Sequence, residues 1–170
     1  MDSILFTIES GVAFITMNRP DKLNSFNRGM ALQLQTILDQ CASDDSIRAI
    51  YLTGAGKGFC AGQDLAEVVD PEGPGMQRIL SEHYNPIVQR LRDIAKPIVG
   101  AVNGVAAGAG ANIAFACDVV VSKSSASFIQ AFSKIGLIPD SGGTYTLPRL
   151  IGFQRASALM MLGDKVSASD

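Results

Sequence analysis

Two glycine-rich stretches, residues 58–65 (GFCAGQDL) and 103–110 (NGVAAGAG), each follow a short apolar run with the composition of a β-strand. Glycine and alanine leave the backbone bare, so such a segment can lie close to another backbone or to a ligand. Two loops of this kind can aim two backbone N–H groups at one point and stabilise the oxyanion of a carbonyl substrate. The sequence therefore predicts an oxyanion hole built from two loops.

The first glycine stretch also matches two nucleotide-binding patterns, each weakly. Residues 56–61 fit the dinucleotide pattern G-x-G-x-x-A, but the positions about 20 residues further on, Ser81 and Glu82, lie in a polar helical segment rather than at a strand end. Lys57 is not followed by Ser or Thr, which excludes a P-loop. The remaining alternative is a pair of tight turns between packed elements, and the presence of two such loops makes it less favoured.

Composition excludes several classes of protein. The 170 residues carry a net charge of −2 with scattered Lys and Arg, which argues against a nucleic-acid surface. Cys41, Cys60 and Cys117 show no C-x-x-C spacing, so we expect reduced thiols, no disulfide frame and no metal site. The start lacks the pattern of a signal peptide, and no apolar run approaches about 20 residues. We expect one cytoplasmic domain over residues 1–170 with no membrane partner.

Hydrophobic periodicity predicts the order of the elements. A hairpin is expected from residues 4–9 and 12–17 around Ser10 and Gly11, because a two-residue turn with glycine joins them. Strand-like and helical segments then alternate, which indicates an α/β layer structure with the site at the carboxyl ends of the strands. These segments are a helix over 27–42, a strand over 47–53, helices over 65–69 and 76 to about 94, a strand over 98–102, a helix over 108–116 and a strand over 119–121.

Two further local patterns bear on the fold. Apolar residues recur at helical spacing in the first long helix, at Met30, Leu34, Ile37, Leu38 and Cys41, and predict its buried face. Residues 70–75 (DPEGPG) form the strongest cluster of helix- and strand-breaking residues in the chain. We expect that segment to be mobile and to gate the site.

Four motifs in this order and spacing resemble the crotonase superfamily of enoyl-CoA hydratases and isomerases. They are residues 18–20 with 24–25, residues 58–65, residues 96–97 with 103–104, and residues 136–139 with 142–143. The resemblance covers essentially the whole of residues 1–170 and implies an α/β fold, a spiral of ββα units that forms an acyl-CoA-binding core domain. The family continues for several helices beyond the matched segment, so the expected fold lacks those carboxyl-terminal helices.

The resemblance also implies a substrate and a site. The substrate would be an acyl-CoA thioester, with coenzyme A as part of the substrate and no separate cofactor, and the full-length protein would be a homotrimer or hexamer. The oxyanion donors would be the N–H groups of Gln63 and Ala109. Residues beside the coenzyme A portion would be Lys22, Leu23, Ala61, Gln63, Asp64 and Leu65.

Departures from the family pattern select among its reactions. Typical hydratases of the family carry glutamates at the two positions that are Asn112 and Phe132 in this chain, and Asp140 is the one carboxylate left. One carboxylate is enough for a 1,3-proton shift, whereas hydration needs one group for water and another for the α-proton. The resemblance therefore favours an isomerase with Asp140 as acid and base, Phe132 and Ile138 forming an apolar wall that raises its pKa.

Residues 126–144 are especially similar to the ring-1,2-epoxyphenylacetyl-CoA isomerase family of phenylacetate degradation. That likeness implies action on 2-(1,2-epoxy-1,2-dihydrophenyl)acetyl-CoA or on a 3-enoyl-CoA. Two other classes stay open: an enoyl-CoA hydratase or an acyl-CoA hydrolase or dehalogenase in which Asp140 activates water or attacks directly, and a non-catalytic coenzyme A-binding partner subunit.

Several of these residues also have plain structural interpretations. Asp140 could cap a following helix, and Asp64 is expected to cap the helix over 65–69. Asn112 is either a satisfied buried amide or a group that orders water or substrate. We expect His83 on a solvated helix face, which excludes a Ser-His-Asp triad. We expect Cys60 to be a small buried residue rather than a nucleophile.

Overall fold

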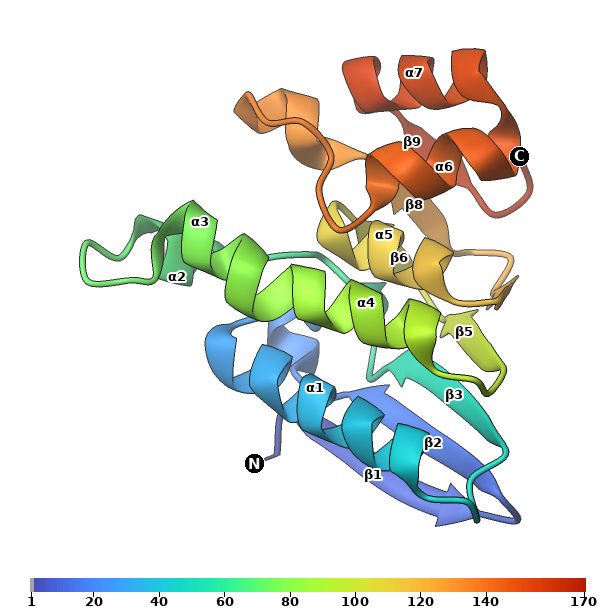
Figure 1. Ribbon diagram of the computed structural model, residues 1–170. Coiled ribbons are helices and arrows are strands. Elements are labelled where there is room, and N and C mark those ends of the chain that lie inside the picture. The colour runs from blue at the N-terminus through green and yellow to red at the C-terminus, as the bar shows by residue number, and fades with distance from the viewer. Residues whose placement is uncertain (1) are drawn as a thin grey trace.

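The computed structural model describes residues 2–170 as two β-sheets accompanied by a stack of helices (Figure 1). The strands are β1 (Ile4–Glu9), β2 (Val12–Met17), β3 (Ala49–Gly54), β4 (Gly58–Cys60), β5 (Ile98–Val102), β6 (Val105–Ala107), β7 (Val119–Ser122), β8 (Ser127–Ile129) and β9 (Lys165–Ser167). The helices are α1 (Arg28–Ser43), α2 (Leu65–Val69), α3 (Gly75–Arg78), α4 (Asn85–Asp93), α5 (Ala109–Ala116), α6 (Gly143–Ile151) and α7 (Phe153–Leu162). Shorter turns are the 3-10 helices η1 (Pro20–Lys22) and η3 (Ala131–Ile135) and the π-helix η2 (Ile79–Tyr84).

From β3 to β8, successive strands belong alternately to the two sheets. The first sheet has the order β1-β2-β3-β5-β7 and the second the order β4-β6-β8-β9. The pairs β3 and β4, β5 and β6, and β7 and β8 thus each give their first strand to one sheet and their second to the other, and these strands run parallel. Helices α1, α4, α5 and α6 stack in chain order alongside (Figure 1). The predicted α/β fold, a spiral of ββα units, is confirmed.

The amino-terminal hairpin follows the prediction at both strands. Ser10 and Gly11 have φ values of 52° and 81°, and Glu9 pairs with Val12 across the turn. Two consecutive positive φ values match the right-handed twist of the flanking strands, which explains glycine at the second position. β2 then pairs in parallel with β3 and so starts the spiral.

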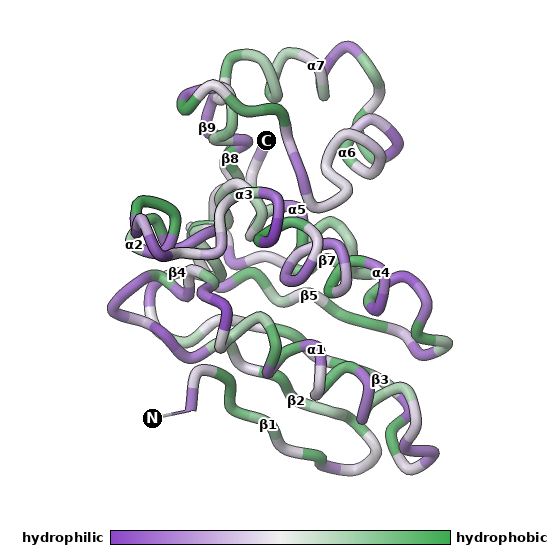
Figure 2. The backbone as a smooth tube through the Cα atoms, turned by 60° about the vertical axis from the view of Figure 1, so that its left-hand side comes forward, coloured by the Kyte–Doolittle hydropathy of each residue, from purple (hydrophilic) through white to green (hydrophobic). Residues whose placement is uncertain are grey.

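Helix α1 covers the first sheet with the face that the sequence predicts. Its predicted apolar residues are all buried, namely Met30, Leu34, Ile37, Leu38 and Cys41. The Asn27 side chain caps the helix by accepting a hydrogen bond from the Met30 N–H at 3.0 Å. Figure 2 shows the hydrophobic colouring continuing through β5 and α5, which lie further along the same core.

The helix predicted over residues 76–94 is interrupted by a π turn. Pro86 has no N–H, so it cannot bond to the Glu82 carbonyl in the preceding turn. Gln35 of α1 satisfies that carbonyl instead, because its Nε2 donates to the Glu82 oxygen at 2.7 Å and to the His83 oxygen at 3.3 Å. The added residue of the π turn brings His83 and Tyr84 to the inner face.

The expectation that His83 lies on a solvated face is therefore wrong. His83 is fully buried, and burial lowers its pKa. The Nε2 atom lies 3.5 Å from Arg28, beside the pair that Arg28 forms with Glu82.

The four short strands of the second sheet, β4, β6, β8 and β9, were not predicted. Each has three residues, which is too short for an alternating pattern to be visible. The segment over residues 70–75 contains a turn in which the Gly73 N–H donates to the Asp70 carbonyl at 2.9 Å. Its predicted mobility stays a prediction.

Successive repeats contact each other through backbone atoms at glycine positions. A Cβ placed on Gly110, in α5, would overlap the carbonyl of Cys60 in β4, and one placed on Gly104 would overlap the carbonyl of Lys57. These contacts allow the second glycine stretch to lie directly on the first. Nothing larger than glycine fits at either position without a shift of backbone.

We expect Gly110→Ala to lower the free energy of unfolding by roughly 1–3 kcal/mol or more, because overpacking against backbone cannot be relieved by a rotamer change. Gly29 is a matched control, since it is exposed in α1 and a Cβ there meets only Asn27 at 3.7 Å. Gly29→Ala should raise stability by up to about 1 kcal/mol. Urea unfolding of both variants measures the difference, and equal midpoints would contradict the close contact.

Candidate active site

The two glycine stretches meet at Gly62 and the start of α5. Gly62 has a φ of 89°, and a Cβ on it would lie 3.0 Å from the Ala107 carbonyl oxygen and 3.4 Å from the Ala109 nitrogen. Gly108 precedes α5 with φ 54° and ψ −127°, a conformation open to glycine. Both loops therefore adopt their shapes because glycine stands at these two positions, and the turn of each adjoins the other.

The N–H of Gln63 is turned away from its neighbouring strand. Phe26 N–H donates to the Gly62 carbonyl at 2.7 Å, and Asp64 N–H donates to the Phe26 carbonyl at 2.8 Å. In a parallel bridge of this pattern, Phe26 uses both of its backbone groups while those of Gln63 point to the opposite side. The Gln63 N–H forms no hydrogen bond within the described residues 2–170.

The N–H of Ala109 is also free to bind a ligand. Ala109 is the first residue of α5, so its N–H has no partner inside the helix. The positive end of the helix dipole adds to its ability to hold a negative oxygen. Two amides, from Gln63 and Ala109, thus stand available at the junction of the two loops.

Both amide-bearing residues line a cavity of about 490 Å³. The wall comes from the two glycine loops, from α2 and the π-interrupted helix, and from the segment around η3. Among the residues of the described chain that line it, Asp140 is the single carboxylate. The lining residues are Lys22, Ser25, Ala61, Gly62, Gln63, Leu65, Val68, Met76, Ile79, Tyr84, Gly108, Ala109, Ala131, Phe132, Lys134, Ile135, Leu137 and Asp140.

Asp140 lies in the irregular segment between η3 and α6. Burial raises its pKa above the ordinary value of 3.8, while a hydrogen bond from the Ser141 hydroxyl, at 2.8 Å, acts in the lowering direction. The carboxylate does not cap α6, whose N-cap position is Gly142 and which has no side-chain cap. Asp140 is therefore a carboxyl group whose environment favours proton uptake, at the edge of an apolar cavity.

The predicted coenzyme A residues divide into two groups. Lys22, Ala61, Gln63 and Leu65 line the cavity, as does the further cation Lys134. Leu23 and Asp64 do not line it, so their predicted contact with a ligand has no support from the cavity. The Leu23 carbonyl instead accepts a hydrogen bond from the Ala61 N–H at 2.9 Å.

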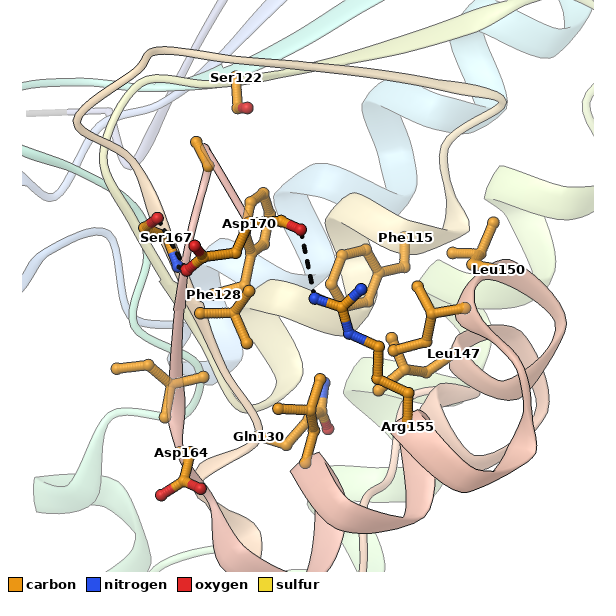
Figure 3. A pocket seen from close by; sticks show the side chains of 15 residues that line it. Phe115, Ser122, Phe128, Gln130, Leu147, Leu150, Arg155, Asp164, Ser167 and Asp170 are labelled. Carbon is orange, nitrogen blue, oxygen red and sulfur yellow. Dashed lines mark hydrogen bonds between the residues drawn. The ribbon is translucent and has the colours of Figure 1, made fainter.

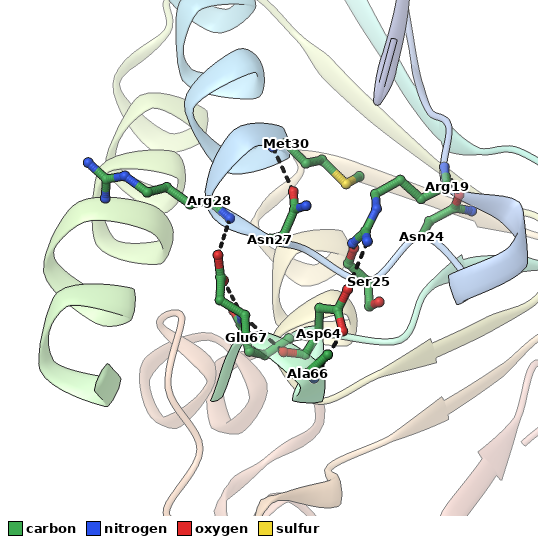
Figure 4. A network of polar contacts seen from close by, with 10 residues as sticks. Arg19, Asn24, Ser25, Asn27, Arg28, Met30, Asp64, Ala66 and Glu67 are labelled. Carbon is green, nitrogen blue, oxygen red and sulfur yellow. Dashed lines mark hydrogen bonds and ion pairs between the residues drawn. The ribbon is translucent and has the colours of Figure 1, made fainter. Parts of the chain in front are cut away.

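Asp64 has a structural role that the sequence predicted. It caps α2 by accepting from the Ala66 N–H at 3.1 Å, and it pairs with Arg19 at 2.8 Å (Figure 4). Arg19 also donates to the Ser25 carbonyl at 2.6 Å. Burial opposes ionisation of Asp64, but the hydrogen bonds from Arg19 and Ala66 outweigh it and lower its pKa.

Glu67 fixes the side chain of Gln63. One Glu67 oxygen accepts from the Gln63 Nε2 at 2.7 Å, and the other accepts from the Arg28 backbone N–H at 2.8 Å. Figure 4 shows Glu67 reaching from α2 to the first turn of α1. The loop that carries Gln63 is therefore tied to α1 through Glu67, a residue that the sequence analysis did not predict for the site.

The predicted apolar wall is half right. Phe132 is buried and lines the cavity, but Ile138 is 81% exposed and does not line it. Leu137 takes its place, because the chain turns outward between Gly136, with φ 72°, and Asp140. Tyr84 was missed: it reaches the cavity only through the π turn, and its hydroxyl is buried with no partner in the described chain.

Cys60 is buried as predicted, and Asn112, for which two interpretations were open, is a satisfied buried amide. Cys60 is fully buried, and burial raises the pKa of its thiol to about 12, so it is not a reactive thiolate. Asn112 is fully buried and satisfied: its Nδ2 donates to the Asp140 carbonyl at 2.8 Å, and its Oδ1 accepts from Gln130 Nε2 at 2.7 Å.

A second, smaller cavity of about 250 Å³ lies between α6, α7 and the strands β8 and β9 (Figure 3). The rings of Phe115 and Phe128 stack there with centroids 5.4 Å apart, and Arg155 donates to the Asp170 carbonyl at 3.2 Å. Gln130 lines this cavity, whereas none of the predicted site residues does.

Metal-binding and membrane-spanning features were searched for over residues 2–170. Within that range no three His, Cys, Asp or Glu side chains gather as a metal site would require. Over the same residues, every helix is too short or too polar to cross a membrane.

Comparison with known proteins gives matches along nearly the whole chain. Residues 7–170 match the family model described as enoyl-CoA hydratase/isomerase. A relative in Escherichia coli strain K12, named 1,2-epoxyphenylacetyl-CoA isomerase, is 53% identical over 99% of this chain and 65% of its own length. A Rhodobacter capsulatus protein named "Probable enoyl-CoA hydratase" is 43% identical over 99% of this chain and 64% of its own.

Solved structures agree with the sequence matches. A crystal structure from Mycobacterium abscessus, assigned to the enoyl-CoA hydratase/isomerases, has a TM-score of 0.92 and 38% identity over 98% of this chain and 65% of that one. The chain thus spans a little under two thirds of the length of the curated relatives it matches, 65% and 64% for these two.

Burial of Asp140 has a consequence for stability. Because its folded pKa is raised, the folded chain retains a proton that the unfolded chain has already lost, and stability falls as pH rises through that interval. Asp140→Asn should therefore be more stable than the unmodified protein at pH 7 in urea unfolding, and the gain should shrink as pH falls toward 3.8.

Asp44→Asn is a control for which the expected change in stability at pH 7 has the opposite sign. Hydrogen bonds from Ser46 lower the pKa of Asp44, so its contribution is present at neutral pH and is lost as pH falls. Loss of this carboxylate should destabilise the protein at pH 7. A destabilising effect of Asp140→Asn at pH 7 would contradict the buried, proton-favouring environment.

Proposed function

Because the chain belongs to the enoyl-CoA hydratase/isomerase family, we propose that it is part of an acyl-CoA isomerase with Asp140 as the proton shuttle. The substrate is an acyl-CoA thioester. Its acyl group is the ring epoxide of 2-(1,2-epoxy-1,2-dihydrophenyl)acetyl-CoA or a 3-enoyl chain. The relative named as a 1,2-epoxyphenylacetyl-CoA isomerase supports the first of these.

The oxyanion hole in this proposal consists of the Gln63 and Ala109 N–H groups. They donate to the thioester carbonyl oxygen, where negative charge develops when a neighbouring proton leaves. Support comes from the two amides, which form no hydrogen bond within residues 2–170 and line one cavity. Fixed donors of this kind need no reorganisation at the moment of reaction.

Asp140 moves the proton. For a 3-enoyl thioester, the carboxylate takes a proton from carbon 2, the dienolate forms with its charge on the thioester oxygen, and the protonated carboxyl returns a proton to carbon 4. One proton leaves and one returns, so a single carboxyl group completes the shift. The raised pKa of Asp140 brings the group closer to the pH at which it can both accept and donate.

The observation that carries the proposal is that, of the residues within 2–170 that line the cavity, Asp140 is the single carboxylate. Phe132 lies in the wall as an apolar group, and Asn112 is engaged with Gln130 and the Asp140 carbonyl. Neither can act as the second acid or base that hydration needs. An isomerase needs only one acid–base group, and Asp140 supplies it.

The coenzyme A portion is assigned to the residues the resemblance implies, Lys22, Leu23, Ala61, Gln63, Asp64 and Leu65. Lys22 and Lys134 place two positive charges on the cavity wall, where phosphate groups of coenzyme A are favourable partners. The proposal includes no cofactor besides coenzyme A within the substrate and no metal. A homotrimer or hexamer stays the predicted assembly.

A hydratase is the second candidate, because the Rhodobacter capsulatus relative is named as one. In a hydratase or hydrolase, Asp140 would activate water, and the product would contain an oxygen atom from the solvent. Turnover in water labelled with oxygen-18 separates the candidates: an isomerase product carries no label.

The direct test follows conjugation of a 3-enoyl-CoA by ultraviolet absorbance. Asp140→Asn should lower kcat by about 100-fold to 10,000-fold, the range that a positioned acid–base group contributes, while coenzyme A still binds. Asp39→Asn, on an exposed ion pair with Arg90, should leave kcat unchanged. Undiminished turnover by a folded Asp140→Asn variant would refute the proposal, and tight binding without turnover in the unmodified protein would indicate a non-catalytic subunit.

A further inference from the structure

Asn112 links the segment that carries Asp140 to the helix that carries an oxyanion donor. Its Nδ2 donates to the Asp140 backbone carbonyl at 2.8 Å from a fully buried position on α5. Among residues 2–170, this is the one hydrogen bond to Asp140 from a residue distant in the chain, since its other donors are the Ser141 hydroxyl and the N–H of Gly143, the first residue of α6. The Asp140 segment is therefore anchored from outside at Asn112.

The segment needs such an anchor because its backbone is in an uncommon conformation. Ser141 has a φ of 51° and Gly142 a φ of 74°, so two successive residues are left-handed. A non-glycine residue with this φ is held in place by its surroundings rather than by its own preference. Gly143 then packs so closely on Asn112 that a Cβ would overlap the amide.

The Asp140 carbonyl determines which end of the Asn112 amide faces it, and Gln130 binds the other end. The Asp140 carbonyl can only accept, so Asn112 must direct its NH₂ group there and its oxygen to Gln130. Gln130 Nε2 donates to that oxygen at 2.7 Å, and Gln130 is itself only 4% exposed. Two buried side chains, Gln130 and Asn112, thus form a chain of hydrogen bonds that ends at the Asp140 carbonyl.

Helix α5 converts this anchor into a fixed spacing. Ala109 and Asn112 are three residues apart, which is about 4.5 Å along a helix axis and nearly one turn. The helix that presents the Ala109 N–H to the thioester oxygen therefore also holds the backbone from which the Asp140 carboxyl projects.

We propose that Asn112 is a positioning residue that sets the place of the Asp140 carboxyl relative to the oxyanion amides, with Gln130 holding the opposite end of its amide. The inference rests on the proposed function and goes beyond it by naming the residue that fixes the position of the Asp140 carboxyl group. In an active site, a displacement of about 1 Å can reduce the rate about 100-fold.

The test is Asn112→Leu in the protein at the full length in which it occurs, because leucine has a similar shape and cannot donate. We expect kcat for 3-enoyl-CoA conjugation to fall about 10-fold to 100-fold, while KM and the dissociation constant for coenzyme A change less than about twofold. Thr53→Val is the matched control, since the Thr53 hydroxyl donates to the Ala101 carbonyl at 2.8 Å in the first sheet. It should leave kcat and KM unchanged.

A double variant guards against misfolding. Asn112→Leu leaves the Gln130 amide without its acceptor, whereas Asn112→Leu with Gln130→Leu removes both polar partners and restores an apolar contact. The double variant should unfold at a urea concentration closer to that of the unmodified protein, yet retain the low kcat.

Unchanged kcat in either folded variant would overturn the inference, as would a parallel loss of kcat and coenzyme A affinity. If the unmodified protein itself shows no turnover, the proposed function fails. Turnover by the unmodified protein together with unchanged kcat in the variants refutes the role of Asn112 alone.

Discussion

Contact between bare backbones of successive ββα repeats is the constraint on which the rest of the structure depends. Gly110 lies on the Cys60 carbonyl and Gly104 on the Lys57 carbonyl, in both cases without room for a Cβ. Gly62 approaches Ala107 and Ala109 in the same way. The cavity, the two available amides and the position of α5 all follow from this close packing. The same glycines therefore shape the candidate site and allow the repeats to pack.

Local sequence patterns were sufficient where an element is decided by its own residues. The hairpin around Ser10 and Gly11, the buried face of α1, and the cap at Asp64 each depend on neighbours in sequence, and each was predicted correctly. The strands β4, β6, β8 and β9 were missed because three residues are too few to show a period. Their place in a second sheet is set by pairing between residues far apart in the chain.

Errors at the site trace to contacts between distant residues. His83 is buried in a π turn whose Glu82 carbonyl, left without a donor by Pro86, is satisfied by Gln35, 47 positions before Glu82. No local pattern in residues 76–94 contains that information, so the helix was predicted as regular. The family resemblance placed Ile138 on the cavity wall, yet Leu137, which follows the left-handed Gly136, lines the cavity instead. Glu67 likewise gained its role through Arg28 of α1.

The π turn over Ile79–Tyr84 means that the cavity wall is specified by a count of residues as well as by their identity. A π turn contains one more residue than a turn of α-helix, so every side chain before it is rotated by about 100° relative to those after it. Met76, just before the π turn, and Ile79 and Tyr84, its first and last residues, all line the same cavity. The number of residues in this stretch is therefore a structural determinant of the cavity wall. Deleting one residue from the π turn would change the wall even if every remaining residue were kept.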